Sequence, residues 1–200
     1  AGTVRRDRGS GPGLELERLL FQSDDQSVVG LRLALTNTGR QPLRLRELRP
    51  CVAKGPEALT VAAAGFRDWR VLRMARQKND IPGAFRPARQ DVDLADALFE
   101  SGEVVAGMGV SADGSGPGAA AAPVVRCDPC LIVRNDADAS MPGLFMGVFG
   151  QTEHLSRIEF AAAPHRRAFE RLAVVCEFDG VLVRPGETRS THWLLIAETT

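Results

Sequence analysis

The segment Gly65–Pro82 contains the side chains of this sequence that are best suited to binding a polar ligand. An indole ring can cover the C–H groups of a sugar, while guanidinium, ammonium, amide and carboxylate groups can form hydrogen bonds with its hydroxyls. The other interpretation is that the indole packs on the edge of a sheet and the charged groups are solvated, and residue types alone favour it. The residues concerned are Trp69, Arg76, Lys78, Asn79 and Asp80.

The same segment lacks the alternation of apolar and polar residues that is typical of a half-buried strand. Trp69 is flanked by Asp68 and Arg70, and the positive charges continue to Lys78. We therefore interpret it as a solvated loop or a polar binding surface, not as a strand of the core.

Catalytic chemistry of other kinds finds little support in the sequence. The histidines, His154, His165 and His192, lie in no recognisable motif, and no serine lies in a GxSxG turn. We expect His154 and His192 to be partly buried polar residues at strand ends, and His165 to lie in a solvated turn. No catalytic residue is predicted, and the chain alone is not expected to be an enzyme.

The cysteines and paired carboxylates give only weak indications of a metal site. Cys127 and Cys130 have the CxxC spacing, but no second pair and no histidine at ligand spacing completes a tetrahedral zinc site. Structural or free thiols are the preferred interpretation, and zinc or redox chemistry is the alternative. Calcium at Asp91 and Asp93, or at Asp136 and Asp138, is a minor alternative, since no calcium-binding loop surrounds them. We predict no metal and no cofactor.

Length and composition limit the class of protein. A chain of 200 residues fits one domain, and 25 basic residues balance 25 acidic ones, so global charge does not favour nucleic acid or a membrane. No apolar run reaches the roughly 20 residues that a membrane helix needs. We expect a soluble protein that binds neither nucleic acid nor membrane, located in the bacterial cytoplasm or secreted.

The pattern of apolar residues predicts an all-β, antiparallel β-sandwich that spans residues 1–200 as a single domain, with at most one short helix. Asp91–Glu100 is expected to be a short helix or, equally, a loop that packs two or three side chains. Residues 111–123 are expected to form a flexible loop rich in Gly, Ala and Pro, and turns are expected at Phe178–Gly180 and Arg184–Glu187. Because the sequence starts without Met and ends directly after a strand, we expect a domain excised from a larger protein. The expected strands are Leu14–Phe21, Ser27–Thr36, Leu43–Leu48, Ala58–Ala63, Val104–Val110, Val124–Arg134, Gly143–Gln151, Leu155–Ala161, Arg171–Phe178 and Thr188–Ala197.

Three pieces of this sequence resemble a known family. Leu35–Leu45 is similar to an early strand-turn-strand, Leu144–Gln151 to a central strand containing glycine, and Phe178–Glu187 with Trp193–Leu195 to a last hairpin. In this order they resemble the N-terminal β-supersandwich domain of the α-galactosidase and raffinose-synthase type glycoside hydrolases, the melibiase group. The resemblance covers nearly the whole chain, although each piece is a common sandwich motif.

The resemblance implies a noncatalytic domain of a carbohydrate-active enzyme. In that family the carboxylates that cleave the glycosidic bond lie on a C-terminal (β/α)8 barrel of the same polypeptide, and 200 residues leave no room for a barrel of about 250. A tryptophan-bearing loop can help to wall the sugar pocket there, and Trp69 lies where that loop is expected. Phe66, Arg67 and Asp68 depart from its usual aromatic and serine residues, which leaves the substrate open.

Two alternatives to this implied function remain open. The chain could be an independent carbohydrate-binding or adhesion module, or a structural or assembly sandwich without a ligand. Measurable affinity of the isolated chain for glycans would favour the first of these, because a domain that contributes only a rim offers half a pocket.

Overall fold

The alternating strands predicted from the sequence are present in the structure and form two antiparallel sheets. The computed structural model of the chain describes residues 1–55, 59, 68–73, 83–85, 110–111, 124–127, 130–138, 140–150, 153–163 and 168–199. Within these residues the regular elements are strands, which confirms the predicted all-β sandwich. The expected helix Asp91–Glu100 and the expected turn at His165 lie outside the described residues. So does nearly all of the expected strands Ala58–Ala63 and Val104–Val110 and of the loop 111–123.

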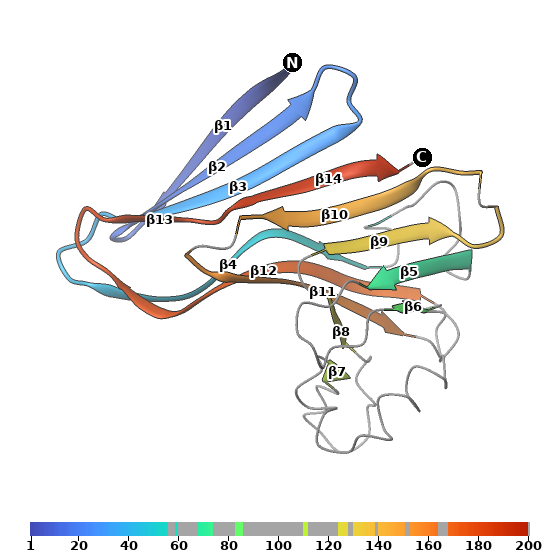
Figure 1. Cartoon of the computed structure of the whole chain (residues 1–200). Helices are drawn as coiled ribbons and strands as arrows, with labels where there is room; N and C mark the ends of the chain where they lie inside the picture. The colour runs from blue at the N-terminus through green and yellow to red at the C-terminus, as the bar shows by residue number, and fades with distance from the viewer. Residues whose placement is uncertain are drawn as a thin grey trace. The chain divides into compact units, whose positions relative to one another are not determined.

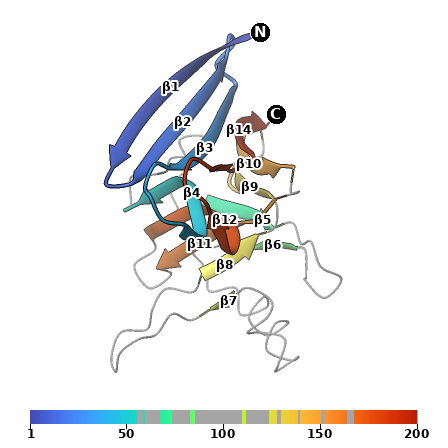
Figure 2. The same ribbon diagram turned by 90° about the vertical axis from the view of Figure 1, so that its left-hand side faces the viewer.

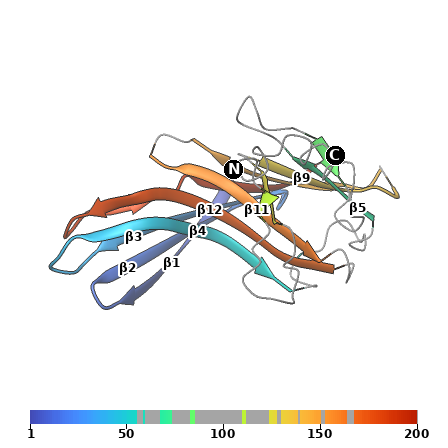
Figure 3. The same cartoon turned by 90° about the horizontal axis from the view of Figure 1, so that it is seen from below.

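The strands divide into a nine-stranded and a five-stranded sheet (Figure 1). The larger sheet has the order β1-β2-β3-β14-β10-β9-β5-β6, with β13 also paired to β3, and the smaller has the order β4-β12-β11-β8-β7. Figure 3 shows β4 and β12 side by side. The bounds are β1 Gly2–Gly11, β2 Leu14–Ser23, β3 Val28–Asn37, β4 Leu43–Lys54, β5 Trp69–Arg73, β6 Gly83–Phe85, β7 Val110–Ser111, β8 Val124–Cys127, β9 Cys130–Asn135, β10 Gly143–Phe149, β11 Leu155–Ala163, β12 Ala168–Val183, β13 Thr188–Ser190 and β14 Trp193–Thr199.

Two compact units can be distinguished in the chain. The first comprises Ala1–Cys51, Met146–Ser156 and Val174–Ala197, and the second comprises Val52–Phe145, Arg157–Ala173 and Glu198–Thr200. Whether the chain folds as one domain stays a prediction.

The core of the first unit is built from side chains of the neighbouring strands β4 and β12. Leu45, Leu48, Cys176, Phe178 and Val183 form a buried cluster there, and partly buried side chains of β3 and β4 pack against it. Period-two spacing accounts for the inward leucines of β3 and β4, and Arg44 and Arg46 between the leucines of β4 are exposed to solvent.

The N-terminal strand β1 was not predicted, because its sequence is charged and not alternately apolar. It pairs along its whole length with β2, and the two strands lie beside β3 in Figure 2. Opposite charges face each other across this pair: Arg8 Nε lies 2.9 Å from Glu17 Oε2, and Arg18 Nη2 lies 2.6 Å from Asp7 Oδ2. Cross-strand charge pairs therefore accompany the backbone ladder in place of a buried apolar face.

Three sequence interpretations need correction. Trp69–Arg73 is strand β5, not a loop, because alternation does hold over its first residues: Trp69 and Val71 are buried while Arg70 and Leu72 are exposed. The turn expected at Phe178–Gly180 is absent, because β12 continues through it with Asp179 at φ 53° and Gly180 at φ 72°. Two expected strands are each split in two, Val124–Arg134 into β8 and β9, and Thr188–Ala197 into β13 and β14.

Candidate functional site

Trp69, the apolar residue of the predicted rim, is a buried residue of the second unit. Only 2% of its surface is exposed, and it faces Asn135 of β9 across the sheet. Its neighbour Arg70 points the other way, with Nε 2.6 Å from Asp136 Oδ1. An indole with so little exposed surface offers no open ring face to a ligand in this conformation.

The four polar residues of the predicted rim, Arg76, Lys78, Asn79 and Asp80, lie outside the described residues. Their assembly around Trp69 therefore stays a prediction.

Two of the histidines are brought together in the first unit, although 38 positions separate them in the sequence. The rings of His154 and His192 have centroids 4.6 Å apart, and the His154 ring also lies 4.9 Å from that of Phe178. The backbone N–H of His192 donates to Nε2 of His154 at 2.9 Å. His192 is partly buried directly before β14, as expected, whereas His154, directly before β11, is 6% exposed and thus more buried than expected.

This contact fixes the protonation of His154 and excludes it as a base for its serine neighbour. Because Nε2 accepts a hydrogen bond, the neutral ring carries its proton on Nδ1, which lies 3.0 Å from Oγ of Ser156. Ser156 in turn donates to Sγ of Cys176 at 3.7 Å. Burial, and next the charge of His192, lower the pKa of His154, while burial raises the pKa of the Cys176 thiol to about 11. An activated thiol needs a lowered pKa, so the Cys176 thiol is not activated. His154, Ser156 and Cys176 therefore form a buried network of satisfied hydrogen bonds.

The second unit contains a buried carboxylate that sequence reasoning did not single out. Glu159 is 7% exposed; its Oε1 lies 3.0 Å from Nε of Arg157, and its Oε2 lies 3.4 Å from Nη2 of Arg171. Both oxygens are thus occupied by guanidinium groups. The alternating charges of Arg157 and Glu159 along β11 were the available signal, but Arg171 comes from the neighbouring strand.

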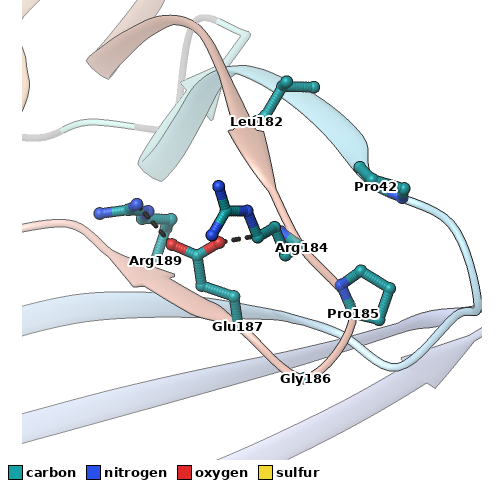
Figure 4. A pocket seen from close by; sticks show the side chains of 7 residues that line it. All are labelled: Pro42, Leu182, Arg184, Pro185, Gly186, Glu187 and Arg189. Carbon is teal, nitrogen blue, oxygen red and sulfur yellow. Dashed lines mark hydrogen bonds and ion pairs between the residues drawn. The ribbon is translucent and has the colours of Figure 1, made fainter.

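A surface hollow of about 640 Å³ lies beside the turn that connects β12 to β13 (Figure 4). In Figure 4 three charged side chains, Arg184, Glu187 and Arg189, gather on one side, and the two prolines lie on the other. The complete lining is Pro42, Leu182, Arg184, Pro185, Gly186, Glu187 and Arg189. The turn Arg184–Glu187 was predicted from its Pro-Gly pair, but its role as the wall of a hollow was not.

Asn37 connects the two loops that form this hollow through hydrogen bonds. Its side-chain amide nitrogen donates to the carbonyls of Gln41 at 2.8 Å and Val183 at 2.9 Å, while Oδ1 accepts from the N–H of Gly39 at 2.9 Å. Its backbone N–H donates to the carbonyl of Glu187 at 3.0 Å. The residue is 1% exposed, so these bonds replace water for a fully buried amide.

The charges in the hollow are unevenly paired. Glu187 Oε2 accepts from the N–H of Arg184 at 2.8 Å, and Glu187 Oε1 accepts from Nη2 of Arg189. The pKa of the Glu187 carboxyl is lowered chiefly by the Arg184 N–H, with the charges of Arg189 and Arg184 adding to the effect. The Arg184 guanidinium is exposed and has no hydrogen bond or ion pair within the described residues. Two cations and one carboxylate leave the lining positively charged.

Metal and membrane chemistry find no counterpart in the part of the chain that the structure describes. There, no three His, Cys, Asp or Glu side chains are grouped so that they could hold an ion, and Cys51, Cys130 and Cys176 are free thiols. None of the described segments is a helix with the length and apolarity that crossing a membrane requires.

Solved structures share the fold of this chain. The GH36 α-galactosidase AgaB from Geobacillus stearothermophilus matches over 94% of this chain with a TM-score of 0.53 at 14% identity. The galactosidase domain of the α-galactosidase-sucrose kinase AgaSK matches over 94% with a TM-score of 0.53 at 10% identity. The chain has the β-sandwich fold of the N-terminal domain of GH36 α-galactosidases. It spans 22% of each of these proteins.

The fold is not confined to α-galactosidases. A putative aldose 1-epimerase from Klebsiella pneumoniae matches over 98% of this chain and 50% of its own, with a TM-score of 0.51 at 10% identity. No protein-family model matches the sequence, and no curated protein matches it either. Identities this low establish the shared fold and nothing finer.

Proposed function

We propose that this chain is a noncatalytic β-sandwich domain of an α-galactosidase-like glycoside hydrolase, packed on a catalytic (β/α)8 barrel of the same polypeptide. The observation that carries the proposal is the extent of the match, because nearly the whole chain aligns with 22% of each α-galactosidase. The remaining length of such a protein is sufficient for a barrel of about 250 residues.

The chemistry of the described residues supports a noncatalytic role. Glycoside hydrolysis uses one carboxyl group as acid and a second as nucleophile or base on opposite sides of the bond. Glu159, the buried carboxylate of the described ranges, has both oxygens engaged by arginines. The Ser156 hydroxyl and Cys176 thiol lie beside a histidine whose Nε2 is already occupied. Neither arrangement provides a free acid and base pair.

The test compares the chain with the natural polypeptide that carries it. The natural polypeptide is expected to continue into a barrel and to release nitrophenol from an aryl α-galactoside, while the 200-residue chain alone releases none. A natural polypeptide without a barrel would refute the proposal.

The finer part of the proposal is that β5 and the segment after it contribute to the rim of the sugar site. Arg76, Lys78, Asn79 and Asp80 would contact the sugar, and Trp69, which is buried in β5, would support them. Removing the buried indole of Trp69 is expected to destabilise the fold by about 3–5 kcal/mol, so Trp69→Ala alone cannot separate binding from folding. The single variants Lys78→Ala and Asn79→Ala in the full enzyme are therefore the sharper test.

Each of these two variants is expected to raise KM for the α-galactoside about tenfold, the loss of one hydrogen bond to a sugar hydroxyl, with an unchanged melting temperature. Arg46→Ala is the matched control, because Arg46 is an exposed residue of β4. Wild-type KM in both variants would remove this segment from the rim.

A second candidate is an independent carbohydrate-binding module. The match to a putative aldose 1-epimerase over 98% of this chain favours it, because there the same fold occurs in a protein named for sugar chemistry outside the α-galactosidases. Saturable binding of monosaccharides or oligosaccharides by the isolated chain on a glycan array would favour this candidate. Absence of binding favours the barrel-associated domain.

A further inference from the structure

We propose that the hollow beside the Arg184–Glu187 turn is a docking site for an acidic side chain of a partner polypeptide, with Arg184 as the cation that receives the carboxylate. The hollow belongs entirely to the first unit, and its lining comes from the β3–β4 loop, the end of β12, the turn that follows it and β13. The proposal is independent of sugar binding, because the residues of the predicted rim take no part in it.

Hydrogen bonds within the chain hold the walls of the hollow in place before any partner binds. Asn37 donates to a carbonyl on each side, at Gln41 and at Val183, and its own carbonyl accepts from the N–H of Gly186 at 2.7 Å. The turn is closed by the N–H of Glu187, which donates to the carbonyl of Arg184 at 2.9 Å. A surface whose loops are already ordered loses little conformational entropy when it binds.

One positive charge of the hollow remains after its charged side chains have paired with one another. Both oxygens of Glu187 are engaged, one by the N–H of Arg184 and one by Arg189. The guanidinium of Arg184 stays exposed with no hydrogen bond or ion pair to a described residue, although its charge acts on the Glu187 carboxylate. A guanidinium offers a planar fork of donors that matches a carboxylate in two parallel hydrogen bonds. The exposed guanidinium of Arg184 therefore selects for a carboxylate.

The uncharged residues that line the hollow are mostly aliphatic and suit a polypeptide partner. Leu182 has 49% of its surface exposed, and Pro42 and Pro185 are exposed beside it. These residues give an aliphatic surface next to the cation, whereas no aromatic ring lines the hollow as a stacking platform for a sugar or a base. An arginine beside exposed apolar side chains is typical of protein interfaces. The expected partner sequence places Glu or Asp next to an aliphatic residue.

The experiment follows the amide and guanidinium signals of the ¹⁵N-labelled 200-residue chain by NMR during titration with acetyl-Leu-Glu-Leu-amide. We expect saturable shifts confined to residues 182–189 and the loop around Pro42, with a dissociation constant in the millimolar range or weaker, because an exposed ion pair contributes little and the aliphatic contacts must supply the rest. The matched probe acetyl-Leu-Gln-Leu-amide is expected to bind at least about tenfold more weakly. No saturation by the acidic peptide, or equal binding of both peptides, would overturn the proposal.

Two variants and one further probe decide between this site and general charge attraction. Arg184→Ala is expected to weaken binding of the acidic peptide about tenfold or more, while Arg46→Ala, which removes an exposed arginine of β4, leaves it unchanged. Sodium acetate at the same concentration is expected to give smaller shifts, because it lacks the aliphatic neighbours. Equal losses in the two variants, or acetate binding as tight as that of the peptide, would show that no polypeptide is selected.

Discussion

Asn37→Ala is the substitution that tests most sharply how the two loops of the hollow are held together. Asn37 is buried in a part of the sequence, Asn-Thr-Gly-Arg-Gln-Pro, whose composition alone would place it in an ordinary exposed turn. The change removes three side-chain hydrogen bonds, to the carbonyls of Gln41 and Val183 and from the N–H of Gly39. It leaves the backbone hydrogen bonds of residue 37 unchanged.

The expected loss of stability depends on whether water can reach the groups that lose their hydrogen bonds to Asn37. The bond to the Val183 carbonyl is buried, so that acceptor stays without water and costs about 1–3 kcal/mol. The bonds to Gln41 and Gly39 are only partly buried, and each contributes about 0.5–1 kcal/mol because water can replace them. The sum is about 2–5 kcal/mol in the free energy of unfolding.

Urea unfolding of the 200-residue chain measures this loss, with Asn135→Ala as the matched control. Asn135 also accepts two turn N–H bonds, from Ala137 and Asp138, but in an exposed turn, so its replacement is expected to cost about 1 kcal/mol. Asn37→Asp, which keeps the shape but removes both donors, is expected to lose at least as much as Asn37→Ala. A loss below about 1 kcal/mol for Asn37→Ala would refute the reasoning.

Three further predictions concern the first unit. The pKa of His154 in the folded chain lies below its ordinary 6.5, so the unfolded chain binds this proton more readily. The contribution of neutral His154 to the free energy of unfolding is therefore fully present above about pH 6.5 and is lost as the pH falls through the folded pKa. His154→Gln should flatten this dependence in urea unfolding from about pH 7 to pH 5, and an unchanged slope would exclude His154 as its source. Gly30→Ala places a methyl group 3.2 Å from two side chains of neighbouring strands and should cost about 1–3 kcal/mol, whereas Gly9→Ala meets nothing within 4 Å and should stay within about 0.5 kcal/mol. Cys176, whose pKa burial raises to about 11, should react with a thiol reagent far more slowly in the native chain than in urea, and equal rates would contradict its burial.

The sequence predicted β4 correctly because its burial alternates: Leu45 is buried between the exposed Arg44 and Arg46. There the leucines at alternate positions carry the signal on their own. The same rule missed β1, whose cross-strand partners are the charges of β2, and it placed a turn within β12 because Asp179 and Gly180 are typical turn residues. In a strand, such positive φ values mark an irregularity of the bulge type and not an end.

The candidate sites were harder to predict, because their parts are distant in sequence. Asn37 and Val183 are 146 positions apart, and His154 and His192 are 38 apart. Residue types identified Asn37 as a turn residue and the histidines as polar residues at strand ends, but pairing them requires the order of the strands in the sheets. The predicted rim depended on Trp69 being exposed, and its neighbours in β5 did not reveal that this strand would bury it.

The turnover of an α-galactoside by the purified 200-residue chain tests the central claim most directly. The account predicts no release of nitrophenol from an aryl α-galactoside above the uncatalysed rate, in contrast to the polypeptide that joins this domain to a barrel. Turnover by the chain alone that is abolished by a substitution within it, such as Glu159→Gln, would contradict the claim that the domain is noncatalytic.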